Sequence, residues 1–521
     1  MADLEQRLRT ARPDLELAAR AAEARAEAAL GIPSRGSSLA VWAGRGRRAR
    51  GLWTLVGLAL IAGLSTALAV SVGGGSGQTS ERGEPASLEF GQSVAVGRAS
   101  GPNPAPAVAV GPRGSVWVAF EQAGRIRVVS RMPNGAWSRP EAISDARMRA
   151  TEPAIAATET GELVAVWRER TAGQLRRERF TLPSGAPAGE LSDVVDRRWA
   201  VRARTLTDDR WGVPSVISRA SPSVDDFAAP QIVAGRGDDV VVLFDRGRGA
   251  YAVEREGDER WNKPTLLGER LGTVVDARLS GDPISGRVIA TWMSREGGVV
   301  GGEMIVQAAI RAPGGTWGPA ERFPAGGVNS RKAFGAINER GEALVAWAPQ
   351  IVVEAGEPTL RLAARSADGR WGPPFQPLPD ARVSNGGGLF LVEPRPLVTS
   401  DGARAVVVAD ATARVAAERP DGTWRERELG GQASGVAAVP DAAGGGLLGA
   451  SVFAGGPATP LERIDATGMR TGAAEPRGAG TGLRLASGLD GTSVVAWARV
   501  RPSGGAYDIV VRVAPGVGGA G

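Results

Sequence analysis

The chain has 521 residues, of which 43% are hydrophobic and 23% are charged, values typical of a globular protein and far from those of a disordered one. It contains no cysteine and no histidine. These two absences exclude disulfides, Cys- or His-based metal sites and the Ser/His/Asp and Cys/His catalytic triads. No phosphate loop, EF-hand or dinucleotide fingerprint stands out, so we expect no cofactor and no metal ion.

The formal net charge of +6 is concentrated at the N-terminus. Residues 1–50 hold ten arginines and six acidic residues, which leaves a net charge of +2 for the rest of the chain. Binding to nucleic acid requires a basic patch on the folded part of a protein. We therefore expect no nucleic-acid partner.

Residues 1–50 are predicted to be a cytoplasmic segment that contains one short helix. Asp14 can cap a helix that runs to Leu30, and Gly31 and Pro33 end it. One interpretation is a solvated, Ala-rich helix, and the other is a docking helix for a cytoplasmic protein partner. The layout resembles that of membrane-anchored anti-sigma proteins in topology, although the His/Cys zinc signature of one large class of them is absent.

Residues 51–72 are predicted to be a transmembrane helix. The uncharged run Leu52–Val72 is long enough, at about 1.5 Å per residue, to cross a lipid bilayer with a hydrocarbon core of roughly 30 Å. Four arginines within Arg45–Arg50 precede this run and Gly-rich sequence follows it, so the N-terminus should be cytoplasmic and the rest extracytoplasmic. The alternative is a signal peptide cleaved near Ala69, after the small-x-small sequence Ala67–Ala69, which would give a secreted protein.

A repeat with a period near 50 residues occupies residues 88–515, between a flexible linker at 73–87 and a Gly-rich tail at 516–521. Its first element is an apolar run that ends in an aromatic residue. The six strongest copies are Ser115–Phe120, Leu163–Trp167, Val240–Phe244, Val288–Trp292, Ala343–Trp347 and Ser493–Trp497, and weaker copies are Ala405–Asp410 and Gly449–Phe453.

The second element of the repeat is a turn signal followed by tryptophan. Asn-Gly and Asp-Gly pairs supply the positive φ that tight hairpin turns need, so each copy is predicted to join two antiparallel strands, with the tryptophan packing in the core. The copies are Asn134–Pro140, Asp208–Pro214, Asp258–Pro264, Gly314–Pro319, Asp368–Pro374 and Asp421–Arg427.

These elements predict an all-β protein in which four-stranded units stack radially into a β-propeller. One full unit is expected to have strands at Pro153–Ala157, Leu163–Trp167, Trp199–Leu206 and Trp211–Ser218. The last unit lacks a fourth strand, and an orphan strand at Leu88–Val96 could complete it and close the ring. Eight copies of the inner run favour eight blades, and seven is the alternative because two copies are degenerate.

The Asp/Asn-Gly-x-Trp turn after a Val-Ala-Val-Trp strand resembles the repeats of sialidase-like (BNR/Asp-box) and lectin-type β-propellers. The nearest segment to an Asp box, Ser366–Trp371, is shorter than the Ser-x-Asp-x-Gly-x-Thr-Trp pattern and lacks its threonine. A sialidase also needs an arginine triad, a Tyr/Glu nucleophile pair and an early Arg-Ile-Pro motif. That motif is absent, so the resemblance concerns the fold and leaves catalysis unsupported.

Ligand recognition in propellers commonly uses the face where the second strands end. That rule predicts a rim of charged residues and assigns no catalytic residue. An insertion between Arg170 and Arg198 falls on the same face, and a loop of this length is functional or disordered. The rim residues are Arg168, Glu169, Arg170, Asp245, Arg246, Arg295, Glu296 and Asp410.

Three functions remain open at this stage. The first is a membrane-anchored, extracytoplasmic, non-catalytic module that binds or scaffolds a glycan, peptide or protein. The second is a transmembrane signalling protein with a cytoplasmic partner on residues 1–50. The third is a glycoside hydrolase with two carboxylates about 5–10 Å apart in a central pocket.

Overall fold

The computed structural model describes residues 90–516 apart from short segments between strands. Those segments are 101–103, 132–134, 171–173, 182–186, 196–197, 219–228, 247–248, 257–259, 270, 272–273, 296–303, 325–331, 349–359, 378–392, 410–412, 420, 431–432, 441–444, 453–460, 466–467, 475–479 and 502–505. The predicted cytoplasmic segment, transmembrane helix and linker lie outside the described residues. Among the residues that are described, no helix is long and apolar enough to cross a bilayer.

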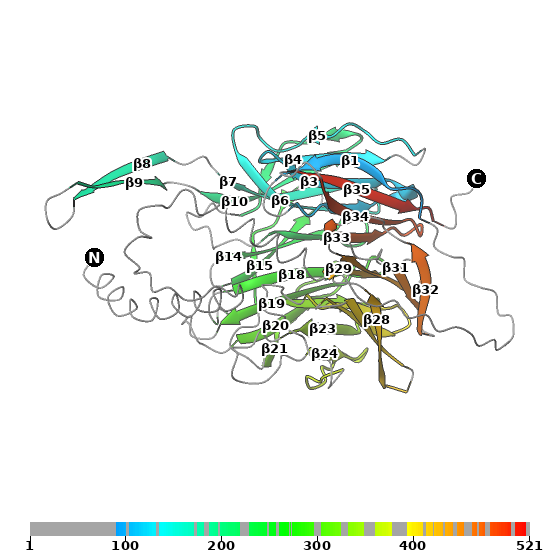
Figure 1. Ribbon diagram of the computed structural model, residues 1–521. Helices are drawn as coiled ribbons and strands as arrows, with labels where there is room; N and C mark the ends of the chain where they lie inside the picture. The colour runs from blue at the N-terminus through cyan, green and yellow to red at the C-terminus, as the bar shows by residue number, and fades with distance from the viewer. Residues whose placement is uncertain are drawn as a thin grey trace, which may run out of the picture. The chain divides into compact units, whose positions relative to one another are not determined.

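The described chain is almost entirely antiparallel β-structure, with one 3₁₀ turn, η2 (Pro112–Gly114). Eight sheets follow one another along it (Figure 1). The first sheet contains β2 (Ala107–Val110), β3 (Val116–Gln122), β4 (Arg125–Arg131) and β5 (Glu141–Ala142), and the second contains β6 (Arg149–Ala157), β7 (Leu163–Arg170), β10 (Trp199–Thr207), β11 (Arg210–Trp211) and β12 (Ser215–Val216). The third contains β13 (Gln231–Ala234), β14 (Val240–Arg246), β15 (Gly249–Glu256), β16 (Arg260–Trp261) and β17 (Thr265–Leu267), the fourth β18 (Val274–Gly281), β19 (Val288–Arg295), β20 (Met304–Arg311) and β21 (Glu321–Pro324), and the fifth β22 (Ala333–Ile337), β23 (Ala343–Trp347) and β24 (Arg361–Arg365). The sixth contains β25 (Arg395–Val398), β26 (Arg404–Ala409), β27 (Ala413–Glu418) and β28 (Trp424–Gly430), the seventh β29 (Ala433–Pro440), β30 (Gly446–Val452), β31 (Leu461–Asp465) and β32 (Gly468–Ala474), and the eighth β33 (Gly480–Ser487), β34 (Ser493–Val500), β35 (Tyr507–Ala514) and the N-terminal strand β1 (Val94–Ala99).

The first strands of the eight sheets touch one another in cyclic order. Strand β2 contacts β6, β6 contacts β13, and the series continues through β18, β22, β25, β29 and β33 until β33 contacts β2 again. A ring of sheets arranged radially around their first strands is a β-propeller, which confirms the predicted fold.

The N-terminal strand completes the last sheet, as the sequence predicts. Strand β1 pairs antiparallel with β35, with Val94 opposite Val511 and Ala99 opposite Tyr507, and the blue and red strands lie side by side in Figure 1. The pairing segment is Val94–Ala99 rather than Leu88–Val96, because Gly91 is held by a single backbone bond to Val513 and the ladder begins only after it.

The hydrophobic core consists of eight clusters of buried apolar side chains, each lying between two neighbouring sheets. Residues of a second strand alternate between the two clusters beside it. In β7, Trp167 belongs to the cluster shared with the first sheet, and Val164 and Val166 belong to the one shared with the third. This is why the second strands are apolar on both faces.

The tryptophans of the turn repeat pack against these clusters, which confirms their structural role. They follow turns between third and fourth strands, such as the turn where Gly369 has φ 92° and Trp371 then bridges to Arg365. The six residues are Trp137, Trp211, Trp261, Trp317, Trp371 and Trp424.

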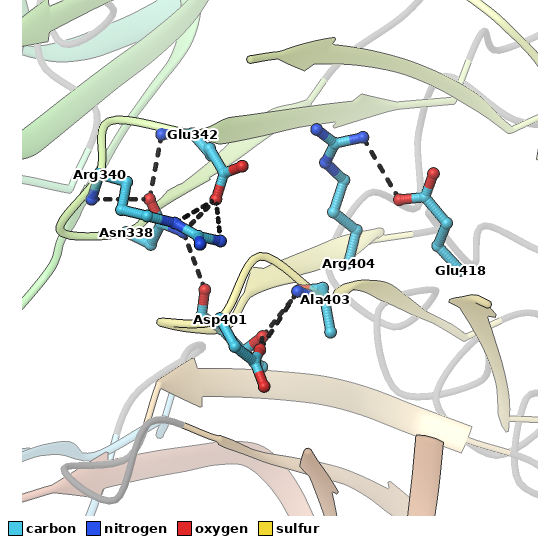
Figure 2. Close-up of polar contacts among 8 residues, drawn as sticks. Asn338, Arg340, Glu342, Asp401, Ala403, Arg404 and Glu418 are labelled. Carbon is cyan, nitrogen blue, oxygen red and sulfur yellow. Dashed lines mark hydrogen bonds and ion pairs between the residues drawn. The ribbon is translucent and has the colours of Figure 1, made fainter. Parts of the chain in front are cut away.

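Turns between first and second strands hold neighbouring sheets together at one end of the ring. Asn338 is 1% exposed and donates to Glu342 Oε2 at 2.7 Å within its own turn and to Thr399 O at 2.9 Å in the next turn (Figure 2). Gly402, with φ 91°, fits there because a Cβ would collide with Arg340 and Glu342 of the neighbouring turn. We call this end of the ring the turn face, and the end where second strands finish the strand-end face.

The insertion at the strand-end face is a β-hairpin rather than an irregular loop. Strand β8 (Gln174–Thr181) pairs with β9 (Pro187–Val195), and in the described part of the chain the two strands pair only with each other. The insertion interrupts the second sheet between β7 and β10, which nevertheless pair over their whole lengths.

Candidate anion-binding site

A cavity of ≈ 730 Å³ runs along the centre of the ring and is lined by the first strands of all eight sheets. Each first strand pairs only with its own second strand, so its other edge turns unpaired backbone N–H and C=O groups toward the cavity. Alanine, valine and leucine side chains flank these edges. The cavity wall is therefore polar along the backbone and apolar between strands.

Three arginines stand at one level of this wall. Arg278, Arg395 and Arg484 are each the third residue before the last residue of their first strands, β18, β25 and β33. Two other first strands place Gln231 and Phe334 in the equivalent position, and the remaining three have alanine there. We call Gln231, Arg278, Phe334, Arg395 and Arg484 the arginine level.

A second set of charges lies two residues before this level on four of the eight first strands, or just ahead of those strands, toward the strand-end face. These residues are Glu152, Asp276, Lys332 and Glu393, and we call them the carboxylate level. Asp276 holds Arg278 with two contacts of 2.8 Å, Nε to Oδ2 and Nη2 to Oδ1. Glu393 accepts from Arg395 Nη2 at 2.8 Å and also pairs with Lys332.

The Phe334 ring is close to two guanidinium groups that come from the first strands of the two neighbouring sheets. The Arg395 guanidinium carbon is 3.9 Å from the ring centre, and that of Arg278 is 5.3 Å from it. Both distances are within the range of cation–π attraction. Carboxylates on one side and the aromatic ring on the other hold the two arginines in fixed places before any ligand arrives.

The charge balance differs among the three arginines. Burial lowers the pKa of Arg278, but Asp276 raises it above its ordinary value, with help from Glu393 and Asp245. Burial lowers the pKa of Arg395, opposed by Glu393. For Arg484, burial and the nearby charges of Arg395 and Arg278 lower the pKa to about 10.

Arg484 forms no ion pair among the described residues, although the charge of Glu393 acts on it and opposes the lowering of its pKa. Its one hydrogen bond there runs from Nη1 to the backbone oxygen of Leu483 at 2.9 Å. Arg395 also keeps a free donor, because its buried Nε has no hydrogen-bond partner within the described chain. A group that brings a negative charge and acceptor oxygens would satisfy both arginines.

Part of the predicted rim contacts the carboxylate level. Arg168 pairs with Glu152 at 2.9 Å and lies 4.5 Å from the Trp199 ring centre, which Arg170 also approaches to 5.1 Å. Glu169 is 6% exposed and accepts from Arg202 Nε at 2.9 Å, so it stabilises the sheet.

The other rim residues are more scattered. Asp245 is buried at the end of β14, where its charge acts on Arg278, and Arg246 and Arg295 end β14 and β19. Glu296 and Asp410 lie outside the described residues. None of the six described rim residues lines the central cavity.

Glu152 has an unusual backbone and an unusual carboxyl group. Its φ is 56°, at a bulge in β6 where the pairing register with β7 shifts, and such a conformation is costly for a residue with a side chain. Burial raises the pKa of its carboxyl group, and the charges of Arg168 and Arg278 oppose that effect only in part.

The arginine level was missed by reading the sequence along each repeat. Its three arginines are separated by about two repeats, and each lies in a largely apolar strand. Aligning the repeats on the turn between first and second strands brings Arg278, Arg395 and Arg484 into one column. Within the described residues, no group of three or more acidic side chains is placed to hold a metal ion.

No protein family matches the chain, and no curated protein matches it in sequence. Solved structures with a similar fold include a polysaccharide lyase, an ulvan lyase, bound to a saccharide of GlcA and Rha3S, with 11% identity and a TM-score of 0.44 over 73% of this chain and 97% of the lyase. An α-L-arabinanase of Penicillium chrysogenum has 13% identity and a TM-score of 0.38 over 82% and 98%.

An intramolecular trans-sialidase of Ruminococcus gnavus has 10% identity and a TM-score of 0.34 over 63% of this chain and 94% of the enzyme. Similarity at this level carries no conclusion about ligand or reaction.

Proposed function

We propose that the chain is a membrane-anchored, extracytoplasmic propeller of eight blades that binds an anionic saccharide in its central cavity and catalyses no reaction on it. The anchor and its orientation rest on Leu52–Val72 and the arginines before it. The observation that supports anion binding is Arg484, a cavity-lining cation that forms no ion pair among the described residues.

The electrostatics favour an anion over a neutral ligand. Arg484 and Arg395 both have lowered pKa values, so the folded protein disfavours their charges, and Arg484 feels the repulsion of the other two arginines. A bound carboxylate or sulfate would remove that repulsion and accept charge-assisted hydrogen bonds. Neutral ligands offer neither effect.

The shape and wall of the cavity favour a saccharide. Its volume of ≈ 730 Å³ is in the range of small-ligand sites and is too small for a folded partner. The free edges of eight first strands offer backbone donors and acceptors to hydroxyl groups from every side. Of the glycan, peptide and protein ligands that the sequence leaves open, the sugar uses these groups best.

A binding role is supported over hydrolysis by the state of the nearby carboxylates. A glycosidase needs one protonated carboxylic acid and a second carboxylate at a defined separation. Burial alone would raise the pKa of Glu393, but Arg395 and Lys332 hold it well below its usual range. Asp276 accepts two bonds from Arg278. Glu152, whose carboxyl pKa is raised by burial, pairs with Arg168 and does not line the cavity.

Calorimetric titration of the full chain in detergent micelles tests the proposal. At low salt we expect saturable binding of galacturonate and none of galactose, which has the same ring without the carboxylate. Arg484→Gln should weaken galacturonate binding by about 10-fold to 100-fold, the value of one or two charge-assisted hydrogen bonds.

Arg499→Gln is the matched control. Arg499 lies in β34 of the same sheet, is 42% exposed and pairs with Asp508, so its loss should leave the affinity within twofold. Equal affinity for both sugars, or an unchanged affinity in Arg484→Gln, would contradict the proposal. Release of reducing sugar from oligogalacturonate would contradict its non-catalytic part.

A further inference from the structure

We propose that the ligand enters the central cavity through the turn face, with its acidic end first, and therefore that the protein recognises a saccharide chain whose charged residue is terminal. This inference rests on the proposed function for the identity of the ligand. The route itself rests on the position of the cavity and on the order of the charges along it.

The cavity opens among the turns that join first and second strands. Its lining continues from the arginine level into such turns in five of the eight sheets. The turn residues in the lining are Gly111, Pro112, Arg113, Thr158, Glu159, Gly235, Pro283, Gly488, Leu489 and Asp490. Leu489 is 50% exposed, so the lining reaches the surface there.

The opposite side of the arginine level is differently built. Neither the carboxylate level nor any described rim residue belongs to the lining. A first strand runs from the strand-end face to the turn face, so Asp276 precedes Arg278 and Glu393 precedes Arg395 along that path. Among the described residues, the arginines thus form the inner end of the lining, and the carboxylates lie behind them.

The order of the charges distinguishes the two possible routes. An anion that came from the strand-end face would first meet Glu152, Asp276 and Glu393, with Lys332 and Arg168 as the compensating cations. An anion that came from the turn face would cross the cavity and meet the arginines directly. At the turn mouth Glu159 accepts from Gly237 N at 2.8 Å and Asp490 from Thr492 N at 3.0 Å, and Arg113 supplies a cation in the same lining.

This geometry restricts the ligand. Only one charged group can lie against Arg484 and Arg395 at the end of the cavity, and the rest of the molecule must extend back past Ala and Val side chains toward the turns. A chain with its acidic sugar at the terminus fits, whereas one with an internal acidic sugar would have to continue through the arginine level.

The absence of cysteine makes the route measurable without the ligand. Gln231→Cys places one thiol at the arginine level, and its modification by the anionic reagent 2-sulfonatoethyl methanethiosulfonate reports access. The full chain would carry this substitution together with either Leu489→Trp, which narrows the turn mouth, or Arg246→Trp, which adds bulk at the strand-end face.

We expect Leu489→Trp to slow thiol modification at least 10-fold and to slow galacturonate association similarly, with Arg246→Trp within twofold of the parent in both measurements. The reverse pattern, or no effect of Leu489→Trp, overturns the route. If the thiol responds as expected and galacturonate does not bind, the route stands and the proposed ligand fails. If galacturonate binds and the thiol responds only to Arg246→Trp, the ligand stands and the route fails.

Discussion

The guanidinium carbon of Arg395 lies 3.9 Å from the centre of the Phe334 ring, closer than any other cation–π pair in the described chain. The ring thus holds the arginine that also pairs with Glu393. Phe334→Leu keeps the apolar volume but removes the ring face. We expect galacturonate affinity to fall about 3-fold to 10-fold, since each cation–π contact contributes about 0.5–1 kcal/mol or more, while the far-ultraviolet circular dichroism is unchanged.

The control for that variant is Phe323→Leu. Phe323 packs against Trp347 and Trp371 in the cluster between the fourth and fifth sheets and faces no arginine in the described chain. It should cost stability without changing the affinity of the folded protein. Equal losses of affinity in the two variants would show that Phe334 acts through packing alone.

Arg484 should decrease stability while it serves binding. Its charge is buried and forms no ion pair in the described chain, so Arg484→Met should raise the free energy of unfolding by about 1 kcal/mol. Millimolar sulfate should raise the thermal midpoint of the parent protein by binding to the folded state and should have little effect on the variant. Differential scanning calorimetry with and without sulfate checks both, and equal sulfate shifts would contradict the prediction.

Glu393 should make stability depend on pH. Its carboxyl pKa is held well below the usual value by Arg395 and Lys332, so its contribution is present above the unfolded-state pKa of about 4.3 and is lost as the pH falls below it. Glu393→Gln should lower the free energy of unfolding by about 2–3 kcal/mol at pH 7, a buried-pair value reduced because the side chain is 26% exposed.

Urea denaturation at pH 7 and pH 3.5 measures this difference, which should shrink at the lower pH. Glu269→Gln is the control, because the Glu269 side chain is 70% exposed in its pair with Arg322 and should change stability by less than about 0.5 kcal/mol at either pH. A pH-independent loss in Glu393→Gln would mean that the side chain matters for packing rather than charge.

Ring closure by β1 can be tested by truncation. Deleting residues 1–99 removes β1 and the buried side chains of Phe90 and Val96, which should cost roughly 3–6 kcal/mol and leave the edge of β35 open to aggregation. Deleting only residues 1–83 stops before the compact unit Glu84–Gly521 and should leave the thermal midpoint unchanged. Size-exclusion chromatography and calorimetry compare the two, and equal behaviour would show that β1 does not hold the ring closed.

The membrane anchor is a prediction from Leu52–Val72, which lies outside the described residues. The full chain should stay in the membrane fraction after carbonate extraction. Leu60→Arg together with Leu64→Arg should abolish this retention, since each arginine at a helix centre costs about 2.5–3.5 kcal/mol. A mature N-terminus at Val70 would instead establish cleavage after Ala69 and a secreted protein.

Much of the fold follows from local sequence. The apolar second strands and the turns before the tryptophans are short-range patterns, so they predict the strand order, the core and the partnership of the two ends. The hairpin β8–β9 was not predicted, because its strands carry charges such as Arg176 and Asp193 where a buried strand would be apolar. In the pairing of β8 with β9, Arg176 lies directly opposite Asp193.

The candidate site could not be predicted in the same way. Arg278 and Arg484 lie more than 200 residues apart, and only closure of the ring brings their charges within reach of each other. At the arginine level their strands each carry one arginine where three of the other first strands carry alanine. The rule that placed recognition at the ends of second strands named residues that hold sheets together, such as Glu169, as well as residues such as Arg168 that touch the edge of the charged cluster.

The pairing of β1 with β35 joins the first strand to be synthesised with the last, since Val94 faces Val511. β1 therefore has no partner in that sheet until β35 has been synthesised, and the ring stays open until then. During that interval the open sheet edges are the part of the folding chain most exposed to proteases and to aggregation.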